Sequence, residues 1–150
     1  MNTRVASIYS ISDMFTDTLD AGGSVKLPVK GVSMYPLFRP DRDYAVISKA
    51  THYKKYDIVF YMRQDGSYVL HRIVGKGKDG FILAGDSEVS KETGVSESQI
   101  LAKTSYIIRN NRQIDVKGFW YGMYSRVWVA LMPLRHCIID LWLRNRKFFK

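Results

Sequence analysis

The sequence predicts a mainly β protein, a compact antiparallel β-rich domain with a helix at each end. Short segments of alternating apolar residues follow one another closely through the middle of the chain. Two Asp-Gly pairs, at 65–66 and 79–80, separate such segments and are typical of tight hairpins. Helical periodicity is confined to the two ends. We therefore expect an N-terminal helix in residues 1–24, the β-rich domain in 25–116 and a C-terminal helix in 117–150.

Residues 5–20 have the pattern of an amphipathic helix. The apolar residues recur at spacings of three and four: Val5, Ile8, Ile11, Phe15 and Leu19. Gly22 and Gly23 are expected to end this helix. The segment also carries three aspartates, so it predicts neither a membrane span nor a cleavable signal peptide.

The middle of the chain predicts seven strands. Val25, Leu27 and Val29 alternate with polar residues and indicate the first. The others are expected at 43–48, 57–62, 67–75, 79–84, 100–108 and 112–116. Residues 88–99 are polar and are expected to form a loop. At 150 residues, 46% of them apolar, the chain is long enough for one hydrophobic core.

The C-terminal segment combines apolar, aromatic and basic residues. Residues 117–150 hold seven Lys or Arg and one acidic residue, Asp140, and so carry six of the nine net positive charges. The longest uninterrupted apolar run, 127–134, is eight residues long, whereas a membrane span needs about 20. We expect a helix lying on an anionic membrane surface. A helix packed on the core with a solvated basic tail, and a re-entrant or spanning helix, are the alternatives.

Nucleic acid is not an expected partner, although the sequence pI is about 9.7. The basic residues of the C-terminal segment are interleaved with bulky apolar groups, which suits a membrane surface better. The single cysteine, Cys137, excludes an intrachain disulfide and is interpreted as a small buried apolar residue. The three histidines are widely scattered and show no ligand spacing, so neither a metal nor another cofactor is implied.

Three residues in order provide the groups of hydroxyl-based nucleophilic catalysis. Ser33 is followed by His71 thirty-eight residues later and by Asp86 fifteen residues beyond that. Serine is a poor nucleophile until a base takes its proton. Taken singly, the three residues also suit a loop hydroxyl, a packed core histidine and a turn aspartate. Arg72, beside the histidine, is expected to brace the site through a salt bridge.

Five short motifs surround these residues in a fixed order. They are GVSMYP at 31–36, YDIVF at 56–60, YVLHRIV at 68–74, AGDS at 84–87 and ILAK at 100–103. In this order and spacing they resemble the signal peptidase I family, part of a wider group of serine peptidases that includes the LexA-like self-cleaving repressors. The resemblance covers residues 28–108 and implies that 25–116 is a serine peptidase catalytic domain. One departure is the tyrosine at position 56, where the family has glycine.

The histidine at position 71 selects a branch of that family. Most bacterial signal peptidases have lysine there, whereas the archaeal and endoplasmic-reticulum type has histidine. The resemblance therefore implies that Ser33 is activated by His71 with an acidic partner. Histidine has an ordinary pKa near 6.5 and needs little adjustment to act as a base. Asp86 is the first candidate for the acid, and Glu92, six positions further on, is the alternative.

The resemblance implies a serine endopeptidase that removes signal or leader peptides from exported polypeptides. Met34 and Tyr35 are expected to line the cleft for the peptide or preprotein, and the Ser33 N–H to stabilise the oxyanion. We expect association with a prokaryotic cell membrane, without an indication of the side. The alternatives are a LexA-like self-processing regulator and a catalytically inactive peptide-binding homologue.

Overall fold

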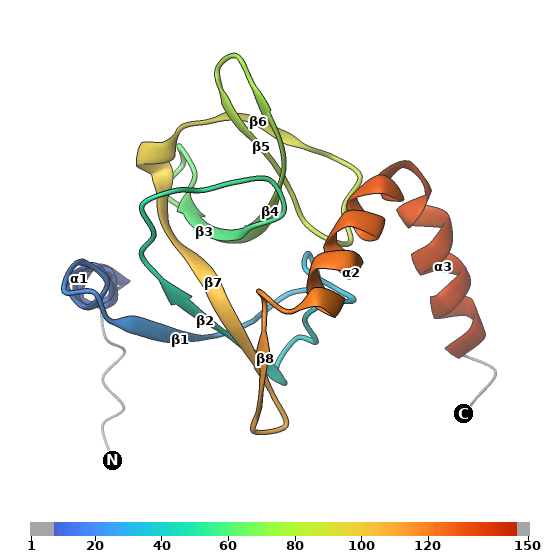
Figure 1. Ribbon diagram of the computed structural model, residues 1–150, viewed down its shortest axis with the longest axis horizontal. Coiled ribbons are helices and arrows are strands. Elements are labelled where there is room, and N and C mark those ends of the chain that lie inside the picture. Colours follow the sequence, from blue (N-terminus) through green and yellow to red (C-terminus); the bar gives the residue numbers. More distant parts are fainter. Residues whose placement is uncertain (1–7, 147–150) are drawn as a thin grey trace.

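The computed structural model describes residues 8–146 as one antiparallel sheet and three α-helices (Figure 1). The strands are β1 (Ser24–Pro28), β2 (Asp43–Ser48), β3 (Ile58–Met62), β4 (Tyr68–Gly77), β5 (Gly80–Ala84), β6 (Glu92–Val95), β7 (Ile100–Arg109) and β8 (Arg112–Asp115). Their order across the sheet is β1-β2-β7-β3-β4-β5-β6, and β8 pairs with β7. The helices are α1 (Ile8–Asp20), α2 (Phe119–Ala130) and α3 (Arg135–Arg146). The predicted β-rich class is confirmed.

Both Asp-Gly hairpins are present. The first joins β3 to β4, with Met62 opposite Tyr68. The second joins β4 to β5. Gly66 and Gly80 have φ values of 83° and 141°. Residues with a side chain rarely adopt these values, which explains why glycine occupies both turns.

Both faces of the central strands are buried. Successive side chains of a strand point to opposite faces. Ile58 of β3 accordingly lies in one apolar cluster and its neighbour Val59 in another. The first cluster consists of Leu19, Val29, Met34, Phe38, Ala45, Ile47, Ile58, Ala102 and Ile107. The second consists of Val59, Tyr61, Ile73, Phe81, Leu83, Val95 and Ile100.

The same alternation separates two neighbouring polar residues of β4. His71 pairs in register with Val59 and faces the second cluster, whereas Arg72 pairs with Ile58 on the opposite face. Their exposed fractions are 1% and 0%. Because buried polar groups are costly unless they are partnered, both side chains must find partners inside the fold.

Three sequence predictions differ from the structure. The segment expected to be a loop contains β6, whose Glu92 and Val95 pair with β5, and a 3-10 turn at Glu97–Gln99. The single C-terminal helix is two helices separated by a 3-10 turn at Met132–Leu134, because Pro133 lacks an N–H and cannot continue α2. Cys137 is exposed instead of buried. Residues 5–7 of the expected first helix lie outside the described part.

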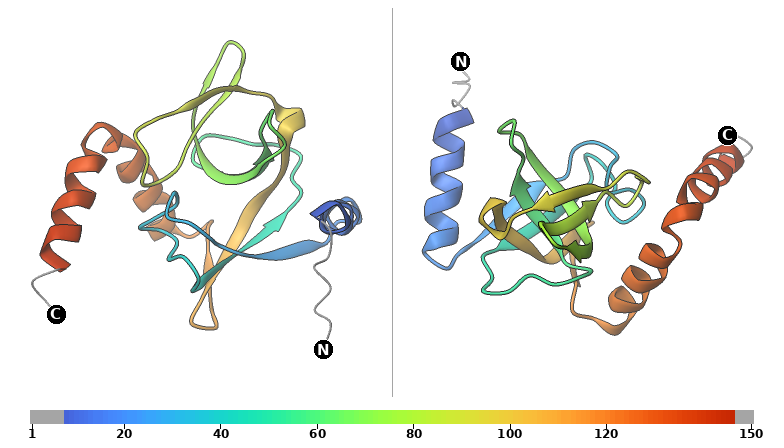
Figure 2. Two further views of the ribbon diagram at one scale, coloured as in Figure 1. Left: turned by 180° about the vertical axis from the view of Figure 1, so that it is seen from behind. Right: turned by 90° about the horizontal axis from the view of Figure 1, so that it is seen from above.

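The N-terminal helix is far from the two C-terminal helices. Figures 1 and 2 show α1 beside β1, and α2 with α3 on the other side of the molecule. Between residues 8 and 146, no helix is both long and apolar enough to cross a membrane.

Candidate active site

A hydrogen-bonded network fixes the imidazole of His71. Tyr61, two residues along β3 from the register partner of His71, places its hydroxyl 3.3 Å from His71 Nδ1. The same hydroxyl donates to Glu92 Oε2 at 2.8 Å. Arg63 donates through Nε to Glu92 Oε1 at 2.9 Å and also through Nη2. Residues of β3, β4 and β6 thus meet at one histidine.

The bond from Tyr61 to Glu92 favours one tautomer of the neutral imidazole. A phenol has one proton, and Tyr61 uses it in the bond to Glu92. Towards His71 the hydroxyl can therefore only accept, so the proton of the neutral imidazole is on Nδ1. The lone pair is then on Nε2, the nitrogen that can act as a base.

Burial and hydrogen bonding favour these protonation states. Burial lowers the pKa of His71 below its ordinary value, and the carboxylates of Glu88 and then Glu92 oppose this only in part. Burial also raises the pKa of Tyr61, as does its bond to Glu92, so the phenol stays protonated. Burial by itself raises the pKa of Glu92. The hydrogen bonds from Arg63 and Tyr61 have the larger effect, so the pKa is lowered overall. At neutral pH the histidine is neutral and the glutamate is ionised.

Glu88 is the acidic residue next to the free nitrogen. Its Oε2 lies 3.6 Å from His71 Nε2, and its side chain is 38% exposed. The same oxygen is 3.4 Å from the backbone nitrogen of Gly85. A carboxylate in this position stabilises the imidazolium that forms when Nε2 takes a proton.

Ser33 contacts the segment formed by residues 85–88 through its backbone carbonyl. The backbone N–H of Ser87 donates to the carbonyl of Ser33 at 2.9 Å, and the Ser87 hydroxyl donates to the carbonyl of Val32 at 2.8 Å. A Cβ on Gly85 would lie 2.5 Å from the Ser33 carbonyl oxygen and 3.0 Å from the Glu88 carboxyl group. The absence of a side chain at Gly85 lets Ser33 and the carboxylate beside His71 approach the same backbone.

The Ser33 hydroxyl and His71 are not hydrogen-bonded to each other within residues 8–146. Ser33 is partly buried, and its hydroxyl makes no hydrogen bond to another described residue. Catalytic hydrogen bonds are often long before substrate binds and tighten in the complex. The structure thus brings the two predicted residues to one segment and leaves the hydroxyl available.

Asp86 faces Arg72. The guanidinium donates through Nε and Nη2 to the two carboxylate oxygens, each at 2.8 Å, and both side chains are fully buried. Arg72 also donates through Nη1 to Ser125 Oγ at 2.8 Å. The salt bridge predicted for Arg72 is present. Of the two candidate acids, Asp86 binds Arg72 of β4 and is contacted by the C-terminal helices. Glu92 is the one that belongs to the hydrogen-bonded network of His71.

The C-terminal helices hold the 85–88 segment in place. Trp128 of α2 donates from its indole nitrogen to the carbonyl of Asp86 at 2.8 Å. Arg135 of α3 is fully buried and donates through Nη1 to the carbonyls of Gly85 and Glu88, at 3.1 and 3.4 Å. The two helices therefore position the backbone that binds the Ser33 carbonyl and carries Glu88, the carboxylate beside His71.

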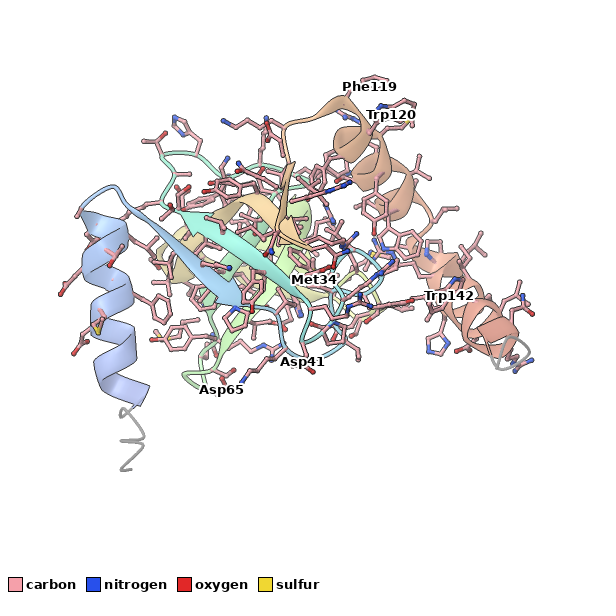
Figure 3. All side chains as sticks on the ribbon, turned by 90° about the horizontal axis from the view of Figure 1, so that it is seen from below. Met34, Asp41, Asp65, Phe119, Trp120 and Trp142 are labelled. Atoms are coloured by element: carbon pink, nitrogen blue, oxygen red, sulfur yellow. The ribbon has the colours of Figure 1, made fainter. Side chains whose placement is uncertain are left out.

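The two residues expected to line the cleft have different environments. Met34 is 2% exposed and belongs to the first core cluster. Tyr35 lines a cavity of about 890 Å³ and lies 5.3 Å, centroid to centroid, from the ring of Trp142. Figure 3 shows Met34 within the body of the protein and Trp142 on α3. Of this pair, Tyr35 is the residue that borders an open space.

Sequence reasoning missed Tyr61, Glu88, Trp128 and Arg135. The alternation along β3 could have placed Tyr61 on the face of His71 once the strand pairing was known. Arg135, an isolated charge within a mostly apolar segment, was a signal for a buried partner. Glu88 and Trp128 had no comparable signal. In the described part of the chain, no group of three or more His, Cys, Asp or Glu could hold a metal ion.

No known family model matches this sequence, and no curated protein matches it.

Proposed function

We propose that this chain is a serine endopeptidase of the signal peptidase I type that removes signal or leader peptides from exported polypeptides. The observation that carries the proposal is the Tyr61 hydroxyl beside Nδ1 of the buried His71, which favours Nε2 as a base near the segment that binds Ser33. The order of the five motifs around these residues supports the same activity.

In the proposed first step, Nε2 of His71 accepts the hydroxyl proton of Ser33 as Oγ bonds to the scissile carbonyl carbon. Glu88 and the ionised Glu92, acting through Tyr61, stabilise the resulting imidazolium. The imidazolium then gives its proton to the amide nitrogen as the C–N bond breaks. An ester on Ser33 remains.

In the second step, water attacks this ester while His71 Nε2 takes one of its protons. The ester C–O bond breaks, the proton returns to Ser33 Oγ, and the carboxylic acid product leaves. The preferred acid in this scheme is Glu92, because it contacts the network of the base, whereas Asp86 binds Arg72. Asp86 retains a positioning function through the 85–88 segment.

The C-terminal helices suit an anionic membrane surface as the second proposed partner. Phe119 and Trp120 are 76% and 74% exposed. They lie at the outer end of α2 (Figure 3). Aromatic side chains with nearby basic residues are typical of segments that bind anionic lipid surfaces. Vesicles of phosphatidylcholine with phosphatidylglycerol are expected to sediment the protein, and pure phosphatidylcholine far less. The F119S/W120S variant is expected to lose this binding.

The peptidase proposal is tested with a peptide carrying an Ala-x-Ala site. Wild type, Ser33→Ala, His71→Ala and the surface control Ser67→Ala are incubated with it, and products are identified by mass spectrometry. Cleavage by wild type and the control, lost in both site variants, is expected. Cleavage that persists in Ser33→Ala contradicts the proposal, and binding without cleavage by any form favours a peptide-binding homologue.

A further inference from the structure

The cavity beside the nucleophile loop has walls of a defined chemical character. One wall comes from the loop, with Tyr35 and Pro36, and the other from the C-terminal helices, with Trp128, Ile139 and Trp142. Its volume of about 890 Å³ falls within the range of roughly 300–1,000 Å³ that is typical of ligand sites. The walls are therefore largely apolar and aromatic.

Two arginines give the cavity a positive charge. Arg39 and Arg42 belong to its lining, and both are exposed. Within the described part of the chain, neither guanidinium forms an ion pair within 4.0 Å of a carboxylate, although Arg39 interacts electrostatically with the buried Asp43. The lining includes no acidic residue. Cationic groups beside apolar walls are complementary to a ligand that is both apolar and anionic.

The cavity is adjacent to the candidate active site. Val32, which directly precedes the nucleophile, and Ser87, which donates to the Ser33 carbonyl, both belong to its lining. An extended peptide with its scissile bond at Ser33 is therefore expected to reach this cavity within a few residues. This adjacency favours a peptide over a lipid as the occupant.

We propose that the cavity is a specificity subsite for a peptide segment that combines bulky apolar side chains with a carboxylate, within a few residues of the scissile bond. The proposal rests on the proposed peptidase function for the bond that is cut, but binding of the segment is independent of cleavage. Arg39 and Arg42 recognise the carboxylate, and the aromatic wall takes the apolar side chains.

Binding is measured first, by titrating the full-length Ser33→Ala protein with peptides and following tryptophan fluorescence, to which Trp128 and Trp142 contribute. Each peptide has an Ala-x-Ala core and a flank of Leu, Phe and either Asp, Lys or Ser, placed on one side of the core or the other. The Asp flank is expected to bind tightest on one side. R39Q/R42Q should weaken its binding roughly tenfold, as expected for two exposed ion pairs. The charge control Arg112→Gln, on the exposed edge of β8, should not change it.

Cleavage of the same peptides by protein with Ser33 intact separates the two proposals. If wild type cleaves all flanks equally and R39Q/R42Q changes neither binding nor cleavage, the subsite is wrong and the peptidase stands. If the Asp-flanked peptide binds through the arginines but no peptide is cut, the peptidase is wrong and the subsite stands. If phosphatidylglycerol vesicles, and no peptide, give the arginine-dependent fluorescence change, the cavity is a lipid site and the subsite is overturned.

Discussion

Replacing Asp86 with asparagine is expected to destabilise the fold far more than it disturbs the base. Asp86 and Arg72 are fully buried and share two hydrogen bonds of 2.8 Å. In wild type the Asp86 carboxylate outweighs the effect of burial and keeps the pKa of Arg72 above its usual range. Arginine is not deprotonated in proteins, so the guanidinium of D86N stays charged without this partner. Removing one partner of a buried pair costs about 3–5 kcal/mol, because the remaining charge is uncompensated.

That loss is a large part of the total stability of a domain, which is about 5–15 kcal/mol. Urea denaturation followed by tryptophan fluorescence measures it as a lower midpoint with an unchanged slope. The control is Asp20→Asn, which removes an exposed ion pair with Lys49 and should change the midpoint little. The R72M/D86L variant replaces the pair with apolar side chains. It should lose less stability than the two single changes together.

Nitrogen NMR of His71 decides the role of Asp86. In D86N the proton of the neutral imidazole is expected to remain on Nδ1, because Tyr61 and Glu92 are untouched. The contradicting result is a D86N variant that loses under about 1 kcal/mol of unfolding free energy and has the His71 proton on Nε2. Asp86 then serves the base directly.

Three other predictions concern the network and the segment beside it. Glu92→Gln removes a carboxylate that raises the pKa of His71, so this pKa should fall. The acid limb of the pH profile of kcat/KM should then move to lower pH. A move of this limb to higher pH contradicts the network. Tyr61→Phe leaves a buried N–H without its partner, at a cost of about 1–3 kcal/mol, and NMR should detect a mixture of imidazole tautomers instead of one. Gly85→Ala places a Cβ 2.5 Å from backbone and should reduce both cleavage and the urea midpoint, whereas Gly75→Ala, 3.6 Å from the nearest atom, should not; equal effects of the two changes exclude a special packing role for Gly85.

The pH dependence of folding follows from the buried base. His71 has a lower pKa folded than its ordinary unfolded value of 6.5, so below that pH the unfolded state binds more protons. Wild type is therefore expected to lose stability as the pH falls from about 6.5, measured as urea midpoints between neutral and mildly acidic pH. His71→Gln should lack this part of the dependence. A variant with the wild-type profile contradicts the assignment of a buried neutral histidine.

Local patterns were sufficient to predict most of the sheet. The hairpins at Asp65-Gly66 and Asp79-Gly80 are set by turn chemistry that the sequence states directly. The strand β6 was missed because Glu92–Val95 includes Gly94, with a φ of 72°, and lacks an apolar alternation. This strand forms because it pairs with β5, and such pairing depends on the tertiary structure and not on the local sequence.

The candidate site also has residues that the sequence could indicate and residues that only the fold reveals. The motifs marked Ser33 and His71 as candidates, and their order predicted that the chain would bring the two residues to one region. The acid near the base was less accessible, because the register of β3, β4 and β6 decides whether Asp86 or Glu92 contacts the network of His71. The bonds from Arg135 to residues 85–88 depend on the break at Pro133, which makes Arg135 the first residue of a new helix.

The most direct test of the central claim is to trap the acyl-enzyme. Wild type, S33A and H71A are mixed with an activated ester of an acyl-Ala-x-Ala peptide, quenched in acid, and digested for mass spectrometric mapping. A single acyl group on Ser33 in wild type, absent from S33A and strongly reduced in H71A, is the predicted result. An acyl group on another residue, or equal labelling of Ser33 in wild type and H71A, contradicts the account.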